Sequence, residues 1–165
     1  MNRRNAVALL AMSFAAPSVA FAAAMGEAEK EHAEQTLAVG SVALETSKAA
    51  QSKVTGAWVK KFTGYEIAEQ TTIAEILKSM GAVPPKMTDK QMAMIAKAKD
   101  GKAGADFDRT YVADQIDGHN QLLKIQDTYI GKGKDAGAIG LAKLARAQIK
   151  EHIDLLETIQ KEMKA

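Results

Sequence analysis

Two glutamates stand one helical turn apart in a stretch that otherwise has the pattern of an apolar helix face. In FTGYEIAEQTTIAEILKSM (residues 62–80), Phe62, Ile73 and Ile76 belong to a stripe with intervals of three and four. The same spacing carried back from Ile73 reaches Glu69 and Glu66. Two carboxylates in an apolar seam cannot both stay ionised unless a positive charge neutralises them. A metal ion, a protonated histidine or a bound proton is therefore expected beside this pair.

Two histidines interrupt the apolar stripes of two later segments in the same way. His119 lies in the stripe of residues 106–130, and His152 lies in that of residues 138–163. Antiparallel helices place residues at equal height when these are equally far from the connecting turn, and both histidines are equally far from the turn at 131–137. Their side chains are therefore predicted to approach each other across the core at one level.

Glu45 is a further candidate, on a helix expected at about residues 29–51. A stripe through Val42 and Glu45 competes there with one through Leu37 and Leu44, and Glu45 lies roughly level with Glu66 when counted from the turn at 52–56. Carboxylates and imidazoles together suit iron, manganese, zinc or copper; the alternative is a polar layer that only specifies helix register. The predicted metal ligands are Glu45, Glu66, Glu69, His119 and His152.

The elements that must position these residues are helices. No stretch shows the alternation of a strand bounded by turn residues, and alanine and leucine are plentiful. Long helices are expected at about 29–51, 57–80, 106–130 and 138–163, separated by breaks rich in glycine and proline such as GAVPP and GKGKDAG. Two helical hairpins of this length predict an all-α, antiparallel four-helix bundle.

The connection between the second and third long helices is too long for a tight turn. Within it, TDKQMAMIAKAKDG predicts a short extra helix with Thr88 or Asp89 as N-cap and Gly101 at its end. Two paths remain open for residues 81–105: they can cross the bundle lengthwise or turn back at one end.

The N-terminus has the pattern of a secretory signal. Arg3 and Arg4 precede the apolar run AVALLAMSFAA, Pro17 breaks it, and small residues surround a cleavage point near Ala22. A membrane anchor, the alternative, needs about 20 uninterrupted apolar residues. Residues 1–22 are therefore predicted to be a cleaved signal and 23–165 a single exported, periplasmic domain without a membrane span.

Composition excludes several classes of protein. Loss of Arg3 and Arg4 with the signal leaves equal numbers of basic and acidic residues, so no basic surface for nucleic acid is expected. The chain has no cysteine, which excludes disulfides, thiolate catalysis and iron-sulfur clusters.

Several other residues are interpreted as structural. Met87, Met92 and Met94 could form a thioether site for copper(I), but the favoured interpretation is that they fill the underside of the short helix. His32 is expected in a solvated first helical turn. Asp108 and Tyr111 are expected to fasten the start of a helix.

Three segments resemble an exported bacterial family of unknown function. They are FTGYEIAEQTTIAEIL, FDRTYVADQIDGHNQLL and IKEHIDLL, and the resemblance extends over about residues 33–159. Members of that family are commonly labelled predicted outer membrane proteins and are grouped with ferritin-like four-helix bundles. The resemblance implies a ferritin-like bundle, places Glu45, His119 and His152 at recurrent positions and brings no established activity. Many members carry a histidine on the second helix, where this chain has Glu69 and Gln70.

Ferritin-like di-iron sites use a glutamate on two helices and an ExxH pair on the other two. Here Ile116 and Ile149 stand three residues before the two histidines, and no ExxH pair is expected near a seam. A di-iron oxygenase or ferroxidase is therefore disfavoured. The expected function is binding of a metal ion or small ligand in the bundle core, or packing against an envelope partner, without turnover. The alternatives are a metal-dependent oxidoreductase and a purely structural envelope protein.

Overall fold

The computed structural model describes residues 25–164, and this part of the chain contains five α-helices and no strand. The helices are α1 (Glu27–Ala50), α2 (Ala57–Ser79), α3 (Asp89–Asp100), α4 (Ala105–Lys132) and α5 (Ala136–Glu162). The expected signal, residues 1–22, lies outside the described residues. The all-helical prediction is confirmed, and the helices are interrupted at the breaks rich in glycine and proline from which their ends were expected.

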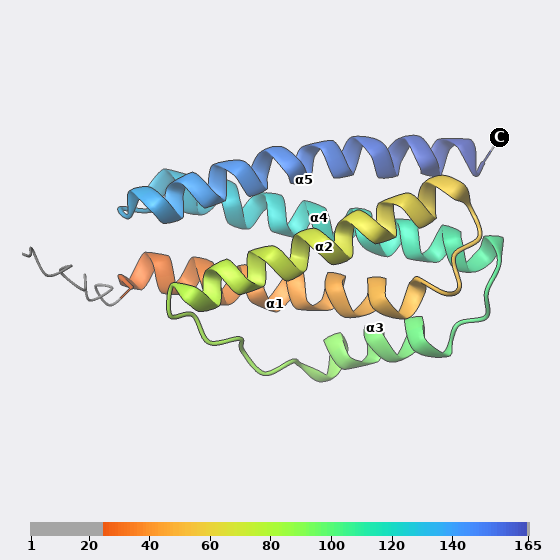
Figure 1. The fold of residues 1–165 in the computed structure, drawn as a ribbon, viewed down its shortest axis with the longest axis horizontal. Helices are drawn as coiled ribbons and strands as arrows, with labels where there is room; N and C mark the ends of the chain where they lie inside the picture. The colour runs from red at the N-terminus through yellow and green to blue at the C-terminus, as the bar shows by residue number, and fades with distance from the viewer. Residues whose placement is uncertain (1–24, 165) are drawn as a thin grey trace, which may run out of the picture.

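The four long helices lie side by side as a bundle, with α3 against its outer side (Figure 1). α1 and α2 form one antiparallel pair, α4 and α5 form another, and α1 also packs on α4. α2 and α4 run in the same direction, so the connection that carries α3 crosses the length of the bundle (Figure 1). The sequence left two paths open for residues 81–105, and the chain takes the one that crosses the bundle lengthwise. No helix among residues 25–164 has the length and apolarity needed to cross a membrane.

The ends of the helices follow from local sequence. Gly81 has a φ of 97°, a left-handed conformation that glycine adopts without steric cost. It lets the N–H of Ala82 donate to the carbonyl oxygen of Leu77 at 3.0 Å, which closes the end of α2. Thr88 begins α3 with a capping box to Gln91. Of the two predicted N-caps, Thr88 is the one that the structure shows.

Asp108 of α4 holds the start of α2. Its carboxylate accepts hydrogen bonds from the N–H of Thr55 at 3.0 Å, the hydroxyl of Thr55 at 2.8 Å and the N–H of Gly56 at 2.8 Å. One turn further along α4, the hydroxyl of Tyr111 lies 2.7 Å from that of Ser47. The structural role predicted for Asp108 and Tyr111 is confirmed, although Asp108 fastens α2 rather than its own helix.

The inward face of α2 differs from the predicted stripe at its C-terminal end. Leu77 is 1% exposed and Ile76 is 37% exposed, whereas the spacing predicted Ile76 inside. A straight helix drifts by about 20° per heptad against a strict seven-residue pattern, so the buried side moves from one position to its neighbour. On α4 the same shift buries Gln115, Leu122 and Tyr129, each one residue before a position that continues the spacing from His119 or leads to it: Ile116, Leu123 and Ile130.

The bundle core consists of apolar clusters with a polar layer between them. One cluster includes Phe62, Val112 and Leu156, and the next along the bundle includes Leu122 and Ile149. On α4 and α5, the residues between these two clusters include a histidine each. The polar layer therefore lies inside the apolar core, where water does not separate its charges.

Candidate metal centre

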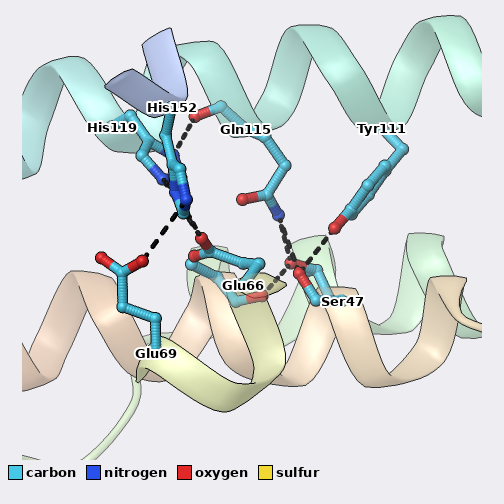
Figure 2. Close-up of polar contacts among 9 residues, drawn as sticks. Ser47, Glu66, Glu69, Tyr111, Gln115, His119 and His152 are labelled. Carbon is cyan, nitrogen blue, oxygen red and sulfur yellow. Dashed lines mark hydrogen bonds and ion pairs between the residues drawn. The ribbon is translucent and has the colours of Figure 1, made fainter. Parts of the chain in front are cut away.

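Glu66, His119 and His152 meet at one level of the core, from α2, α4 and α5 respectively (Figure 2). Nε2 of His119 lies 3.2 Å from Oε2 of Glu66, and Nδ1 of His152 lies 3.3 Å from the same oxygen. The two imidazole nitrogens are 3.2 Å apart. The predicted approach of His119 and His152 across the core is confirmed.

The outward-facing nitrogen of each imidazole has an acceptor of its own. Nδ1–H of His119 donates to the backbone carbonyl oxygen of Gln115 at 2.8 Å. Nε2 of His152 lies 3.3 Å from Oε2 of Glu69, so that its proton points to a carboxylate. These contacts place the proton of each neutral ring on the outer nitrogen and turn the lone pair of the inner nitrogen towards Glu66. This is the arrangement in which proteins hold metal-binding histidines.

The spacing of the three inner atoms fits a small metal ion. An ion about 2.0–2.1 Å from three tetrahedrally placed ligand atoms separates these atoms by roughly 3.3–3.4 Å. The observed separations are 3.2, 3.2 and 3.3 Å. Two imidazole nitrogens and a carboxylate oxygen can therefore hold an ion on three sides and leave a further position free.

The triad is closed off from water, which makes its charges costly. Glu66 and His119 are fully buried, and the side chain of His152 is 12% exposed. Burial acts to raise the pKa of Glu66, but imidazoles that carry a proton on their inner nitrogens as well outweigh it and hold that pKa at about 2. Burial acts to lower the pKa of His119, but the adjacent Glu66 carboxylate has the larger effect, so the pKa of His119 is raised. Each group therefore depends on an opposite charge within the triad.

Both carboxylate oxygens of Glu66 are buried and accept no hydrogen bond of regular geometry from the described residues. Such atoms are rare in folded proteins and are costly when unpaired. Phe62 covers one side of the site, with its ring centroid 5.8 Å from that of His119 and 5.1 Å from that of His152. A carboxylate in this dry surrounding needs a cation next to it.

The structure places the five predicted residues in three different situations. Glu66, His119 and His152 form the triad. Glu69 lies beside it, with its side chain 10% exposed and its contact limited to the outer nitrogen of His152. Glu45 does not join the group, because its side chain is 37% exposed and pairs with Lys48 at 2.8 Å. The inward orientation expected for Glu45 is corrected: α1 buries Thr46 and Ser47 at this height instead.

The expectation for His32 is wrong. This residue is 3% exposed, its Nε2–H donates to Oε1 of Gln126 at 2.7 Å, and its ring stacks on that of Tyr129 with centroids 4.1 Å apart. The turn between α4 and α5 is tied to this end of α1, because Glu29 accepts from the N–H groups of Lys134 and Asp135 at 2.9 and 3.2 Å. The first turn of α1 is therefore covered rather than solvated.

Glu29 and His32 form a buried ExxH pair, so the expectation that none lies near a seam is also wrong. Neither residue points its polar atoms at an open site. Oε1 of Glu29 accepts from the hydroxyl of Tyr129 at 3.0 Å in addition to the two backbone N–H groups, and Nε2 of His32 is bonded to Gln126. These contacts give the pair a structural role: it fastens α1 to α4 and to the start of α5.

Gln115 was not identified from the sequence as part of the site, although it stands one turn before His119 and supplies the carbonyl that orients that ring. The three methionines of the connection do not converge under α3: Met92 is 50% exposed, whereas Met94 lines a cavity of about 380 Å³ between α3 and the bundle. The favoured packing role for the methionines therefore holds for Met94 and not for Met92.

Fold and site together define an all-helical protein with a possible metal-binding triad in its core. The chain belongs to the family described as "Domain of unknown function (DUF4142)", whose model matches residues 14–159. The expected membership in a family of unknown function is thereby confirmed. No curated protein matches the chain. No solved structure matches it either.

Proposed function

We propose that this protein is an exported, ferritin-like helical bundle that binds one first-row transition metal ion through Glu66, His119 and His152. The donor set of two imidazoles and one carboxylate suits iron(II), manganese, zinc or copper(II), because nitrogen and oxygen ligands bind all of these ions. Binding, storage or transfer of the ion in the cell envelope is the function that this site supports best.

One observation carries the proposal. Three electron-rich atoms converge to 3.2–3.3 Å of one another, while the other nitrogen of each histidine is already directed at an acceptor. Without a cation at their centre, two lone pairs and an ionised carboxylate would face each other in a dry core. A proton on His119 is the competing way to supply that charge, and metal titration distinguishes the two.

The ferritin-like arrangement and the exported location rest on different observations. In favour of the arrangement, α2 and α4 run in the same direction and are joined by a connection that crosses the bundle (Figure 1). In favour of export, residues 1–22 combine a basic start, an apolar run and small residues near a cleavage point.

Binding is favoured over catalysis by the path to the site. A groove of about 460 Å³ between α2 and α5 touches Glu69 and His152, but neither Glu66 nor His119 is among the described residues that line it. A substrate in this groove would meet the outer side of His152 and not the ion. A metal-dependent oxidoreductase would need a substrate path into the triad.

The test is metal titration of protein purified without an affinity tag and stripped with a chelator. Iron(II), manganese, zinc and copper(II) are added separately, and binding is followed by calorimetry and thermal unfolding. At least one ion is expected to bind one per chain and to raise Tm. If none binds and Tm stays unchanged with all four ions, the triad is a polar layer and the proposal fails.

Two matched variants locate the site. Glu66→Gln removes a ligand charge and is expected to weaken binding by more than the about 10–100-fold that loss of an outer-shell partner costs. Glu45→Gln makes the same change at a half-exposed position outside the triad and is expected to leave the affinity unchanged. Equal effects of the two substitutions would place the ion elsewhere.

A further inference from the structure

A groove between α2 and α5 adjoins the triad at His152. It has a volume of about 460 Å³, within the range of small-molecule sites, about 300–1,000 Å³. Three of its lining side chains are large, apolar and open to solvent: Tyr65 is 53% exposed, Ile76 is 37% exposed and Leu144 is 61% exposed. Apolar groups exposed together in a hollow indicate a binding surface.

The two ends of this groove differ in polarity. α2 and α5 are antiparallel (Figure 1), so Ile76 of α2 and Leu141 of α5 belong to one end, while Glu69 and His152 belong to the other. Between Glu69 and Ile76, α2 rises by about 10 Å. The groove therefore offers an apolar channel that ends at a polar group.

The polar end is acidic and has an unused acceptor. Glu69 and Glu151 line the groove, and no lysine or arginine does so among the described residues. Oε2 of Glu69 faces His152, whereas Oε1 is buried and has no hydrogen-bond partner among the described residues. Figure 2 shows this second oxygen turned away from the histidine. A donor at this end of the groove would satisfy it once a small rotation of the Glu69 side chain turns this oxygen to the groove.

We propose that the groove binds a cationic amphiphile, a primary amine with a medium-length apolar chain. Its ammonium group donates to Oε1 of Glu69, with Glu151 adding negative charge at the same end. Its chain lies against Ile73, Ile76, Leu141 and Leu144. An anionic amphiphile of the same length is disfavoured, because two carboxylates line the polar end, and the one basic side chain among the lining residues, His152, already faces Oε2 of Glu69.

This inference goes beyond metal binding and does not require it. The oxygen of Glu69 that receives the amine is not the one that faces His152. The amine is therefore expected to bind both the metal-free and the metal-loaded protein, and either property can fail while the other stands.

The test is calorimetric titration of the metal-free full-length chain at neutral pH with octylamine, octanol and octanoate, below their aggregation concentrations. Octylamine is expected to bind one per chain, octanol more weakly and octanoate not at all. Binding of octanoate as tight as that of octylamine would overturn the proposal, because only apolar contact would then be at work. A dimer on gel filtration that the Leu144→Asn substitution dissociates would overturn it as well, because a second copy of the chain would then cover the groove.

Variants separate the two ends of the groove. Glu69→Gln is expected to weaken octylamine binding by about tenfold or more, since a charge-assisted hydrogen bond is lost, and to leave octanol binding nearly unchanged. Leu144→Asn is expected to weaken both several-fold. Trp58→Ser is the control, because Trp58 is also 53% exposed but lies outside the groove. Octylamine affinity that is the same in Glu69→Gln and in the wild-type chain would contradict the assigned acceptor.

Discussion

At the scale of single residues, the triad is defined as much by the outer contacts of its histidines as by its inner atoms. The carbonyl of Gln115 and the carboxylate of Glu69 each face the outer nitrogen of one ring. A neutral imidazole has one donor and one acceptor nitrogen. When the outer nitrogen donates to an acceptor, the inner nitrogen therefore has the lone pair and directs it at the centre of the triad. The contact with the backbone carbonyl of Gln115 cannot be removed by replacement of a side chain, whereas the contact with the carboxylate of Glu69 can.

Glu69→Gln is expected to weaken metal binding about 10–100-fold while the ion still binds one per chain. The amide can still accept from Nε2–H of His152, but it carries no charge to raise the basicity of that ring. Calorimetric titration with the ion that binds the wild-type chain measures the change. A loss as complete as that of Glu66→Gln would instead make Glu69 a direct ligand.

Glu29 is expected to make stability depend on pH in the acid range. The N–H groups of Lys134 and Asp135 hold the pKa of Glu29 at about 2, below its ordinary value of 4.5. A folded-state pKa below the unfolded one contributes stability above pH 4.5 that is lost as pH falls towards 2. Glu29→Gln is therefore expected to lower Tm at neutral pH, and the difference from wild type is expected to shrink below pH 4.5.

The control for this pH series is Glu34→Gln on the same helix. Glu34 is exposed, and its pair with Lys30 is long at 4.0 Å, so its contribution to stability is small. Thermal melts from neutral pH down to about pH 3 compare the three chains. If the Tm of Glu29→Gln stayed below that of wild type by the same amount over this range, the loss would be due to side-chain packing and not to the charge of Glu29.

At the scale of elements, α2 depends on a cap from another helix. Gly56, its N-cap, has no side chain to bond the first turn, and Asp108 of α4 supplies the carboxylate instead. Asp108→Ala is expected to lower the free energy of unfolding by about 2 kcal/mol, and Asp108→Asn by about 1 kcal/mol because one acceptor oxygen remains.

Urea unfolding measures this difference, with Asp106→Ala as the control. Asp106 stands two residues earlier on α4, its side chain is 94% exposed, and it pairs with Arg109 on the surface. Its replacement is expected to change the free energy of unfolding by less than about 0.5 kcal/mol. Similar losses in both alanine variants would mean that Asp108 does not cap α2.

Helix positions could be predicted from the sequence because their signals are local. Glycine, proline and capping residues mark the ends, as Gly81 and Thr88 do. The inward face could be predicted only in part, since one residue of drift exchanges Ile76 for Leu77 and Glu45 for Thr46. His119 and His152 could be paired by counting from a tight turn. The burial of His32 could not, because it depends on contacts with α4 about 90 residues away.

At the scale of the whole molecule, the bundle consists of two parts that differ in how much apolar surface they bury. The four long helices share apolar clusters and the triad, which joins α2, α4 and α5. α3 buries a single residue, Ile95, and is fastened from outside by polar contacts such as that of Gln91 with the carbonyl of Ala38 at 2.9 Å. An element with so little buried apolar surface opens on its own before the core unfolds.

Hydrogen exchange with and without metal is expected to resolve these two parts. Amides of α3 exchange through local opening, whereas amides near Val112 and Ile149, both in the core, exchange only when the bundle unfolds. An ion that binds the folded triad stabilises the bundle by about 2.7 kcal/mol at roughly 100 times its Kd. Exchange near Val112 should slow accordingly, while that of α3, which carries no ligand, should stay unchanged. If α3 slowed equally, it would be part of the cooperative core, and its contacts would contribute far more than one buried isoleucine allows.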